Sequence, residues 1–270
     1  MKTENTLLRK AFTAIILILF ISVLPACGGK SDARVIIAGS TSVQPYAEVL
    51  AEEYASLFPK NEIDVQGGGS AAGIMAAETG AANIGMSSRA LREDEKGLWA
   101  VEIAKDGLAV IVNPKNPVSD LTLEQIRNIY TAEISNWGEL GGPEAKIHII
   151  AREAGSGTRS AFEDLVMSGY EINPKAIVQN SNGAVRQLVS GDPNSIGFIS
   201  LGLVDHTVKA VALEGVEASM ENIFNESYSL FRPFLFVVKS APEGLTAEFI
   251  DFVLSTEGKN ILSDEGLIPY

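Results

Sequence analysis

The chain has 270 residues, of which 46% are hydrophobic and 20% charged, and it carries a formal net charge of −13. This composition excludes a disordered chain and gives enough apolar material for one large domain or two lobes. The acidic balance also argues against a nucleic-acid binder, because surfaces that bind phosphate backbones are normally basic.

Residues 1–26 have the layout of a secretory signal peptide. Basic residues precede an apolar run over residues 11–24, which is short for a membrane span. The run leads through Leu-Pro-Ala to Cys27, the only cysteine in the sequence. This junction resembles a bacterial lipobox, in which the cysteine becomes the lipidated first residue, so we expect a lipid-anchored linker over residues 27–32. A signal peptide cleaved without lipidation is the alternative.

The predicted elements begin with three short strands, each followed by a turn rich in Gly and Ser. The strands lie at residues 33–38, 62–66 and 81–86, and the turns at residues 39–42, 67–70 and 87–89. Apolar and small residues at helical spacing predict helices over residues 43–57 and 70–79. In a parallel sheet the carboxyl ends of the strands meet at one edge, so we expect the three turns to face a common point.

A turn is predicted in the middle of the next apolar segment. Residues 98–113 carry two apolar runs around Asp106-Gly107, a pair that is typical of turns. We therefore expect a buried strand over residues 108–112, after the turn.

The remaining elements alternate between strands and helices. A capping-box pattern at Thr122 and Gln125 opens one helix, and Ser181 or Asn182 caps a later one. The predicted strands lie at residues 146–151, 176–179, 195–199, 208–213 and 234–238, and the predicted helices at 122–130, 160–167, 183–190, 246–254 and 258–262. This alternation favours an α/β fold with parallel sheets. We expect one lobe from residues 33–110 plus 232–270 and a second from residues 111–231.

The strand over residues 146–151 runs directly into the motif R-E-A-G-S-G-T-R. A glycine-rich turn between a strand and a helix leaves the first N–H groups of the helix free to bind an oxyanion. Ser156 and Thr158 add hydroxyl donors, and Arg152 and Arg159 add guanidinium groups that can bind two oxygens of phosphate or sulfate at once. The alternative is that Ser156 only caps the helix and that the arginines are solvated.

Five motifs occur in a specific order along the chain. They are G-S-T-S at residues 39–42, G-G-G-S at 67–70, I-G-M-S-S-R at 84–89, N-W-G-E-L-G-G at 136–142 and R-E-A-G-S-G-T-R at 152–159. Together they resemble the PstS-type phosphate-binding proteins of bacterial ABC importers, over nearly the whole mature chain. The resemblance implies a two-lobed periplasmic-binding-protein fold, in which each lobe is a mostly parallel sheet flanked by helices and the ligand lies in the cleft between the lobes.

The resemblance also assigns the residues that bind phosphate. Carried over position by position, they are Thr41, Ser42, Ser70, Arg152, Ser156, Gly157 and Thr158. Ser88 stands where many members have an aspartate that accepts the proton of hydrogen phosphate and rejects sulfate, which leaves selectivity over sulfate open. We also predict that the adjacent Arg89 pairs with the anion, the alternative being a surface ion pair. Members often have an acid two residues after the motif arginine; here that residue is Ala154, with Glu153 adjacent.

The function implied is that of an extracytoplasmic solute-binding lipoprotein, which captures inorganic phosphate and delivers it to the permease subunits of an ABC transporter. The protein would be a monomer, either anchored to the outer face of the bacterial cytoplasmic membrane by a lipid such as palmitate on Cys27, or periplasmic. A binding protein for another tetrahedral oxyanion, such as sulfate, molybdate or tungstate, is the nearest alternative.

Enzyme functions fit the sequence poorly. The sequence has no Gly-x-Gly-x-x-Gly and no P-loop with its lysine, and G-S-G-T lacks the frame of a nucleophile elbow. The two histidines are His148, on a predicted strand, and His206, in a predicted loop, without the spacing of metal ligands. We therefore predict no catalytic residue, cofactor or metal, and keep a phosphate-ester hydrolase as a remote alternative. Trp99 and Trp137 are expected to pack in a core or interface.

Overall fold

The structure, a computed structural model, describes residues 34–270. The predicted signal peptide, Cys27 and the linker over residues 27–32 lie outside the described residues. Strands and helices alternate along most of the described part, which confirms the predicted α/β class. No helix between residues 34 and 270 combines the length and the apolar character that crossing a bilayer requires.

The strands are short, apart from one that extends over fourteen residues. They are β1 (Arg34–Gly39), β2 (Glu62–Gly67), β3 (Ile84–Ser87), β4 (Trp99–Val112), β5 (Asp120–Leu121), β6 (His148–Arg152), β7 (Ile177–Gln179), β8 (Ser195–Ser200), β9 (Lys209–Ala210), β10 (Ala212–Leu213), β11 (Phe231–Val238) and β12 (Ile268–Pro269).

The helices connect these strands and cover the sheet. They are α2 (Gln44–Leu57), α3 (Ser70–Thr79), α4 (Leu123–Thr131), α5 (Gly157–Phe162), α6 (Asn182–Gly191), α7 (Met220–Phe224), α8 (Gly244–Leu254) and α9 (Thr256–Asp264), with shorter helical segments η1 (Glu93–Glu95), η2 (Trp137–Leu140), η3 (Glu163–Met167) and η4 (Leu201–Leu203). The helix predicted over residues 160–167 is therefore divided into α5 and the π-helical segment η3.

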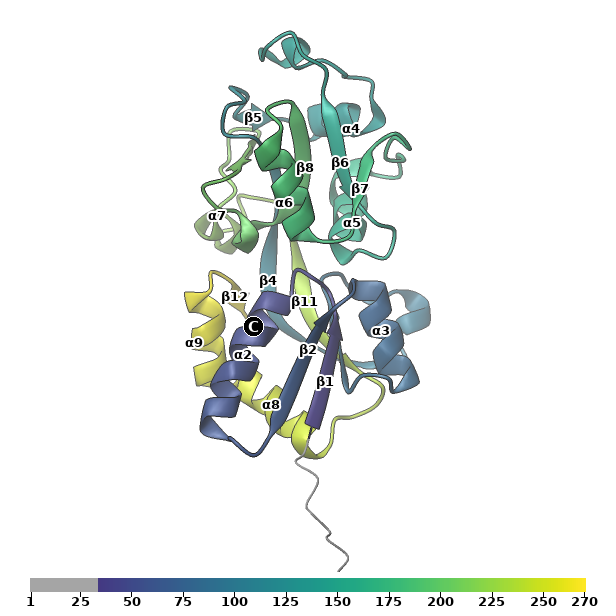
Figure 1. Cartoon of the computed structure of the whole chain (residues 1–270), viewed down its shortest axis with the longest axis vertical. Helices are drawn as coiled ribbons and strands as arrows, with labels where there is room; N and C mark the ends of the chain where they lie inside the picture. Colours follow the sequence, from purple (N-terminus) through teal and green to yellow (C-terminus); the bar gives the residue numbers. More distant parts are fainter. Residues whose placement is uncertain (1–33) are drawn as a thin grey trace, which may run out of the picture. The chain divides into compact units, whose positions relative to one another are not determined.

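Most strands join one ten-stranded sheet, whose main path has the order β2-β1-β3-β11-β4-β8-β6-β7. The predicted parallel pairing is found at both ends of this path, where β1 pairs with β2 and β3, and β6 pairs with β7 and β8. Between these groups β11 and β4 are antiparallel to each other and to their outer neighbours. Figure 1 shows β4 and β11 running side by side from one group of strands to the other.

The two largest hydrophobic cores of the described residues lie along the sheet. One gathers side chains from both ends of the described chain, such as Leu50 and Phe249, and the other gathers side chains from its middle. In the second core Phe162 and Phe198 stack with ring centroids 4.0 Å apart. Strand β4 contributes to both cores, so the polypeptide crosses between them within a continuous strand. The lobe boundaries, residues 33–110 with 232–270 and residues 111–231, stay a prediction.

The predicted turn at Asp106-Gly107 is wrong, because β4 continues through both residues. Asp106 is fully buried and lies opposite Arg232 of β11, with which it forms an ion pair. Gly107 has no space for a side chain, since a Cβ there would lie 2.4 Å from Ile223 Cδ1. A residue pair that is typical of turns is used here for charge pairing and close packing inside a strand.

Two smaller differences concern the edges of elements. The strand predicted over residues 208–213 is divided, because β9 pairs with β4 while β10 pairs with β5. Leu57 continues the apolar pattern of α2 but is 48% exposed, whereas Leu50 and Tyr54 of the same pattern are buried.

Helix α3 lies very close to β1 and β3 because glycines meet at the contact. A Cβ at Gly73 would lie 2.5 Å from the carbonyl oxygen of Ala38 and 2.6 Å from Gly39 Cα, and a Cβ at Gly85 would lie 2.4 Å from the carbonyl oxygen of Gly73. These neighbours are backbone atoms, which cannot rotate away. The close packing places Ser70, the first residue of α3, at the carboxyl ends of the strands.

We expect Gly73→Ala to lower the free energy of unfolding by about 1–3 kcal/mol, the usual cost of overpacking. Gly183→Ala is the matched control, because Gly183 is also helical and a Cβ there meets nothing within 4 Å; its stability should be unchanged or raised by about 0.5–1 kcal/mol. Urea denaturation followed by circular dichroism measures both. Equal stabilities of the two variants would contradict the close packing at α3.

Candidate functional site

The three Gly- and Ser-rich turns meet at one edge of the sheet, as the parallel strands predict. The N–H groups of Gly68 and Gly69 donate to the carbonyl of Gly39 at 2.8 and 2.9 Å. The N–H of Ser40 donates to the carbonyl of Met86 at 3.0 Å. These backbone bonds connect the carboxyl ends of β1, β2 and β3.

Hydroxyl groups from the turns form a buried chain of hydrogen bonds. Ser40 Oγ donates to Ser88 Oγ at 2.9 Å, and the N–H of Ser88 donates to Ser70 Oγ at 3.0 Å. Ser70 Oγ and Ser88 Oγ lie 3.3 Å apart. All three serines are at most 2% exposed. The turns therefore present polar groups to the interior, where each group needs a partner.

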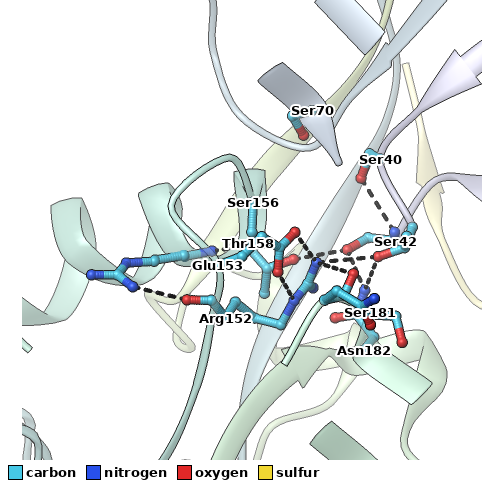
Figure 2. A network of polar contacts seen from close by, with 12 residues as sticks. Ser40, Ser42, Ser70, Arg152, Glu153, Ser156, Thr158, Ser181 and Asn182 are labelled. Atoms are coloured by element: carbon cyan, nitrogen blue, oxygen red, sulfur yellow. Dashed lines mark hydrogen bonds and ion pairs between the residues drawn. The ribbon is translucent and has the colours of Figure 1, made fainter. Parts of the chain in front are cut away.

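The motif after β6 meets these turns directly. Gly157 leaves no space for a side chain, because a Cβ there would lie 2.3 Å from Ser70 Oγ and 2.6 Å from Ser88 Oγ. Thr158 Oγ1 lies 2.9 Å from Ser42 Oγ, and Figure 2 shows the two side chains pointing toward each other. Segments far apart in the sequence thus bring their hydroxyl groups into one place.

Arg152, at the end of β6, is 1% exposed and is held by its neighbour Glu153. Its Nε and Nη2 donate to the two carboxylate oxygens of Glu153, both at 2.9 Å, and Nη2 lies 3.3 Å from Thr41 Oγ1 (Figure 2). Nη1 is buried and has no hydrogen-bond partner within residues 34–270. The question that the sequence leaves open at Ala154 is answered, because the adjacent Glu153 orients the guanidinium.

Asn182, at the start of α6, is a residue of this cluster that the sequence analysis missed as a site residue. Ser181 caps the helix by accepting a backbone N–H, which leaves the Asn182 side chain for other contacts. Its Nδ2 donates to Ser42 Oγ at 2.9 Å and to Thr41 Oγ1 at 3.2 Å, while its Oδ1 accepts the N–H of Ser200. The signal in the sequence was the presence of two capping residues in a row where a helix needs one.

Arg232 and Asp106 add a buried ion pair, which the sequence analysis also missed. Nε and Nη2 of Arg232 donate to Asp106 Oδ2 at 3.1 and 3.0 Å, and Nη2 donates to Ser42 Oγ at 3.1 Å. Burial raises the pKa of Asp106 and lowers the pKa of Arg232, and the attraction between the two charges opposes both shifts. Asp106-Gly107 suggested a turn, so neither partner could be recognised from the sequence.

The structure brings together all the predicted binding residues except Arg89. We call the buried or half-buried residues that gather here the polar cluster: Ser40, Thr41, Ser42, Ser70, Ser88, Arg152, Ser156, Gly157, Thr158, Asn182 and Arg232. The assignment of these residues to phosphate stays a prediction.

The prediction for Arg89 is corrected by its geometry. Its Nη1 and Nη2 donate to the two carboxylate oxygens of Glu95 at 2.7 Å each, and Nη1 also donates to the carbonyl of Ala90. The ion pair that we gave as the alternative is therefore present, although the guanidinium is buried and faces η1. The positive charge that we assigned to Arg89 is placed in the polar cluster by Arg232 instead.

Two residues of the motif make contacts that support the helix and the loop. Ser156 caps α5 by accepting the N–H of Arg159 at 3.2 Å. Arg159 directs Nε to Glu163 at 2.7 Å and Nη1 to the carbonyl of Arg152 at 2.9 Å, so its guanidinium supports the loop from outside. Arg152, by contrast, is buried rather than solvated.

The histidines and tryptophans lie where the sequence placed them. His148 opens β6 and its Nδ1 lies 2.6 Å from Asp192 Oδ2, outside the polar cluster, while His206 is exposed in a loop. Trp137 is fully buried, and Trp99 is partly buried in β4.

Hydrogen-bond directions within the cluster follow from counting donors and acceptors. A hydroxyl has one hydrogen and two lone pairs, whereas guanidinium and amide NH₂ groups only donate. Thr41 Oγ1 accepts from Arg152 and Asn182, and Ser42 Oγ accepts from Asn182 and Arg232. The lone pairs of both hydroxyls are occupied, so Ser42 donates its one hydrogen to Thr158 Oγ1, whereas Thr41 keeps its hydrogen for a further group.

The Ser70 and Ser88 hydroxyls are arranged differently. They receive two hydrogen bonds, from Ser40 Oγ and from the N–H of Ser88, and share one with each other. The pair therefore retains one hydrogen and one lone pair, whichever serine donates to the other. This side of the polar cluster can both donate to an oxygen and accept a proton.

Comparisons with known sequences agree on one family. A family profile described as the PBP superfamily domain matches residues 26–257. The phosphate-binding protein PstS of Bacillus subtilis strain 168 is 32% identical over 246 residues, which cover 89% of this chain and 82% of that protein. The protein of the same name from Borreliella burgdorferi is 28% identical over 274 residues, which cover 96% of this chain and 98% of that protein.

Solved structures give the same result. A protein of Clostridium perfringens, described as a phosphate ABC transporter substrate-binding protein with bound phosphate, is 46% identical with a TM-score of 0.85, over 88% of this chain and 99% of that one. An ABC-type phosphate transport receptor from Vibrio cholerae is 42% identical with a TM-score of 0.73, over 87% of this chain and 99% of that one.

Two cores joined by crossing strands, with a polar cluster built by segments from both, define a solute-binding protein of the periplasmic type. The chain belongs to the PBP superfamily and, within it, to the PstS phosphate-binding proteins. Proteins of this family bind a solute without converting it, so the prediction of a binding protein rather than an enzyme is confirmed.

The pairing of Arg89 with Glu95 gives a prediction for stability against pH. Hydrogen bonding by Arg89 holds the pKa of Glu95 below its ordinary value of 4.5. A lowered pKa in the folded state stabilises the protein fully above the unfolded pKa, and this contribution is lost as the pH falls through the folded pKa. We expect Glu95→Gln to lower the free energy of unfolding by roughly 1–3 kcal/mol at pH 7, because a buried donor loses its partner. The deficit should shrink below pH 4.5.

Glu93→Gln is the matched control, because Glu93 lies in the same segment but forms an exposed pair with Lys96. Exposed pairs contribute little, so its stability should equal that of the parent within about 0.5 kcal/mol. Urea titrations at several pH values, from about 3.5, which is below the ordinary pKa of a carboxyl group, to about 8, measure both variants. A deficit of Glu95→Gln that stays constant across this range would contradict the proposed ionic contribution.

Proposed function

We propose that this protein binds inorganic phosphate in the polar cluster and passes it to an ABC importer. The observation that carries the proposal is the buried Arg152, which two acceptors of Glu153 hold in place while its Nη1 has no partner within residues 34–270. A buried guanidinium donor without a partner raises the free energy of the protein. An anion that accepts a hydrogen bond from this donor would remove the cost, which would favour binding. The phosphate-binding proteins to which the chain is similar support the choice of anion.

The donors around Arg152 suit a tetrahedral dianion. Thr41 can only donate, Thr158 keeps its own hydrogen when it accepts from Ser42, and the Ser70 and Ser88 pair supplies another hydrogen. Hydroxyl and guanidinium donors are stronger toward charged oxygens than toward neutral ones. The site would therefore bind phosphate by hydrogen bonds and one or more arginine contacts, without any chemical step.

The hydrogen phosphate dianion carries a proton that the sulfate dianion lacks, and in a buried site that proton needs an acceptor. The lone pair that the Ser70 and Ser88 hydroxyls retain fits this requirement, so phosphate can satisfy both the donor and the acceptor on that side. Sulfate would use the donor alone. A hydroxyl is also free to turn its hydrogen toward a sulfate oxygen, which an ionised carboxylate cannot do. We therefore propose a preference for phosphate with measurable binding of sulfate, while molybdate and tungstate stay weaker alternatives.

Export and membrane anchoring belong to the same proposal. The chain would act outside the cytoplasm as a monomer, held at the outer face of the cytoplasmic membrane by a lipid on Cys27 or free in the periplasm. The apolar run over residues 11–24, followed by the only cysteine of the sequence, supports this arrangement. A permease of an ABC transporter is the partner that the family membership suggests.

Calorimetric titration of the purified protein tests the proposed ligand. We expect phosphate to bind with one site per chain, and sulfate to compete with an affinity lower by about 10- to 100-fold, which corresponds to the loss of one buried hydrogen bond to a charged group. If sulfate, molybdate or tungstate binds more strongly than phosphate, that anion and not phosphate is the ligand of the protein. Absence of any oxyanion binding would refute the proposal.

Arg152→Ala tests the site itself. Removing one partner of a buried charge pair costs about 2–5 kcal/mol, so phosphate affinity should fall roughly 30-fold or more. Arg127→Ala is the control, because Arg127 contacts Val166 and Ser168 and stands apart from the polar cluster. If Arg152→Ala binds phosphate as tightly as the parent while its fold is intact, the polar cluster is not the site.

Cys27→Ser tests the anchor. In a bacterial host fed with labelled palmitate, the parent should carry the label and fractionate with membranes, whereas the variant should lose both properties, because a serine oxygen does not replace the sulfur that carries the lipid. Ser31→Ala, four residues further along, should behave as the parent. An unlabelled parent would favour the plain cleaved signal peptide.

A further inference from the structure

Arg232 and Arg152 have the same pattern of hydrogen bonds. Each guanidinium gives Nε and Nη2 to its own carboxylate, Asp106 for Arg232 and Glu153 for Arg152, and in each the Nη1 atom is buried without a partner within residues 34–270. A buried N–H donor with no acceptor is rare in folded proteins, because its desolvation is not compensated. Two such donors of the same charge in one cluster indicate a shared acceptor.

The two arginines reach the same turn from different strands. Nη2 of Arg232 donates to Ser42 Oγ at 3.1 Å, and Nη2 of Arg152 lies 3.3 Å from the adjacent Thr41 Oγ1. Asn182 Nδ2 connects both hydroxyls. Burial lowers the pKa of Arg232, and repulsion by the charge of Arg152 acts in the same direction. An anion that accepts from both would remove that repulsion.

We infer that Arg232 is a second cationic ligand of the anion and that Asp106 is the positioning residue that aims it. This inference rests on the proposed function and adds a binding residue to it. Asp106 lies directly opposite Arg232 in the pairing of β4 with β11, and it accepts from Ser200 Oγ at 2.7 Å, so the carboxylate is fixed from two sides. The ring of Phe234 lies 5.7 Å from the guanidinium carbon and restrains it further.

The second cation has a consequence for the charge of the ligand. With Arg152 and Arg232 facing one anion, the site should favour the dianion of phosphate over the monoanion more strongly than a site with one arginine. The charged and titratable groups around Arg232 are Asp106 on β4, Arg152 on β6 and the buried Tyr46 of α2, whose pKa is raised by burial. Burial raises the pKa of Asp106, but the charge of Arg232 and the hydrogen bond from Ser200 oppose that rise, so the change of affinity with pH should follow the second ionisation of phosphate itself.

The test measures phosphate affinity by calorimetry at two pH values, one below and one above the second pKa of phosphate. The variant is the double substitution Arg232→Met with Asp106→Asn, which removes both charges and leaves no unpaired buried carboxylate. Its affinity for phosphate should fall roughly 30-fold or more above that ionisation, and clearly less below it. Arg232→Lys keeps the charge without the fork, so it should lose affinity but keep the preference for the dianion.

Arg186→Gln is the control, because Arg186 also pairs with an aspartate, Asp205, at a partly exposed position away from the cluster. Its affinity and pH profile should match those of the parent. A double variant that is folded and binds phosphate with the parent's affinity and pH profile would overturn the inference. A parent that fails to bind phosphate would instead refute the proposed function.

A second measurement on the unmodified protein applies even if the double variant does not fold. In nitrogen-15 spectra of the arginine side chains, saturation with phosphate should shift two buried guanidinium signals, and Arg232→Lys should remove one of them. If the signal of Arg232 stays in place while that of Arg152 shifts, Arg232 does not contact the anion and the inference is wrong.

Discussion

The structure depends on two buried guanidinium groups, each clamped by a carboxylate of its own. Arg152 and Glu153 are sequence neighbours, whereas Arg232 and Asp106 face each other across two strands. Burying charges is costly unless every donor is satisfied, and in both arginines one donor remains unsatisfied within the described residues. The fold thus places two buried guanidinium groups, each with an Nη1 that is unpaired within residues 34–270, where the turns after β1, β2 and β3 meet the segment after β6.

The hydroxyl groups around these arginines differ in what they can do, although they are chemically alike. Thr41 has both lone pairs occupied by N–H donors, so it presents a hydrogen only, whereas Ser70 and Ser88 keep one lone pair. The balance of donors and acceptors in the cluster is therefore set in part by neighbouring side chains, such as Asn182, which donates to both Thr41 and Ser42. A serine at position 88 also differs chemically from a carboxylate, because a hydroxyl can donate as well as accept.

Much of this arrangement could be predicted from the sequence, because the signals were local. The strand, turn and helix order predicted that three turns share one edge, and the motif at residues 152–159 predicted Arg152. The residues that the sequence did not reveal are placed by contacts between segments that are far apart in the sequence. Asp106 and Arg232 are 126 positions apart, and their pairing follows from strand order alone. Arg89 was misplaced because its partner Glu95 lies in a helical turn that the sequence pattern did not reveal.

The position of β11 in the sheet limits how much of the protein can fold before synthesis of the chain is nearly finished. Strands β3 and β4 follow each other in the sequence, yet β11, from the last fifth of the chain, lies between them. A nascent chain therefore cannot finish its first core from its own early residues, and the edges of β3 and β4 stay open until Phe231–Val238 has been synthesised. Cleavage just before Phe231, in the last fifth of the chain, would accordingly remove a central strand, together with Arg232, rather than an edge strand.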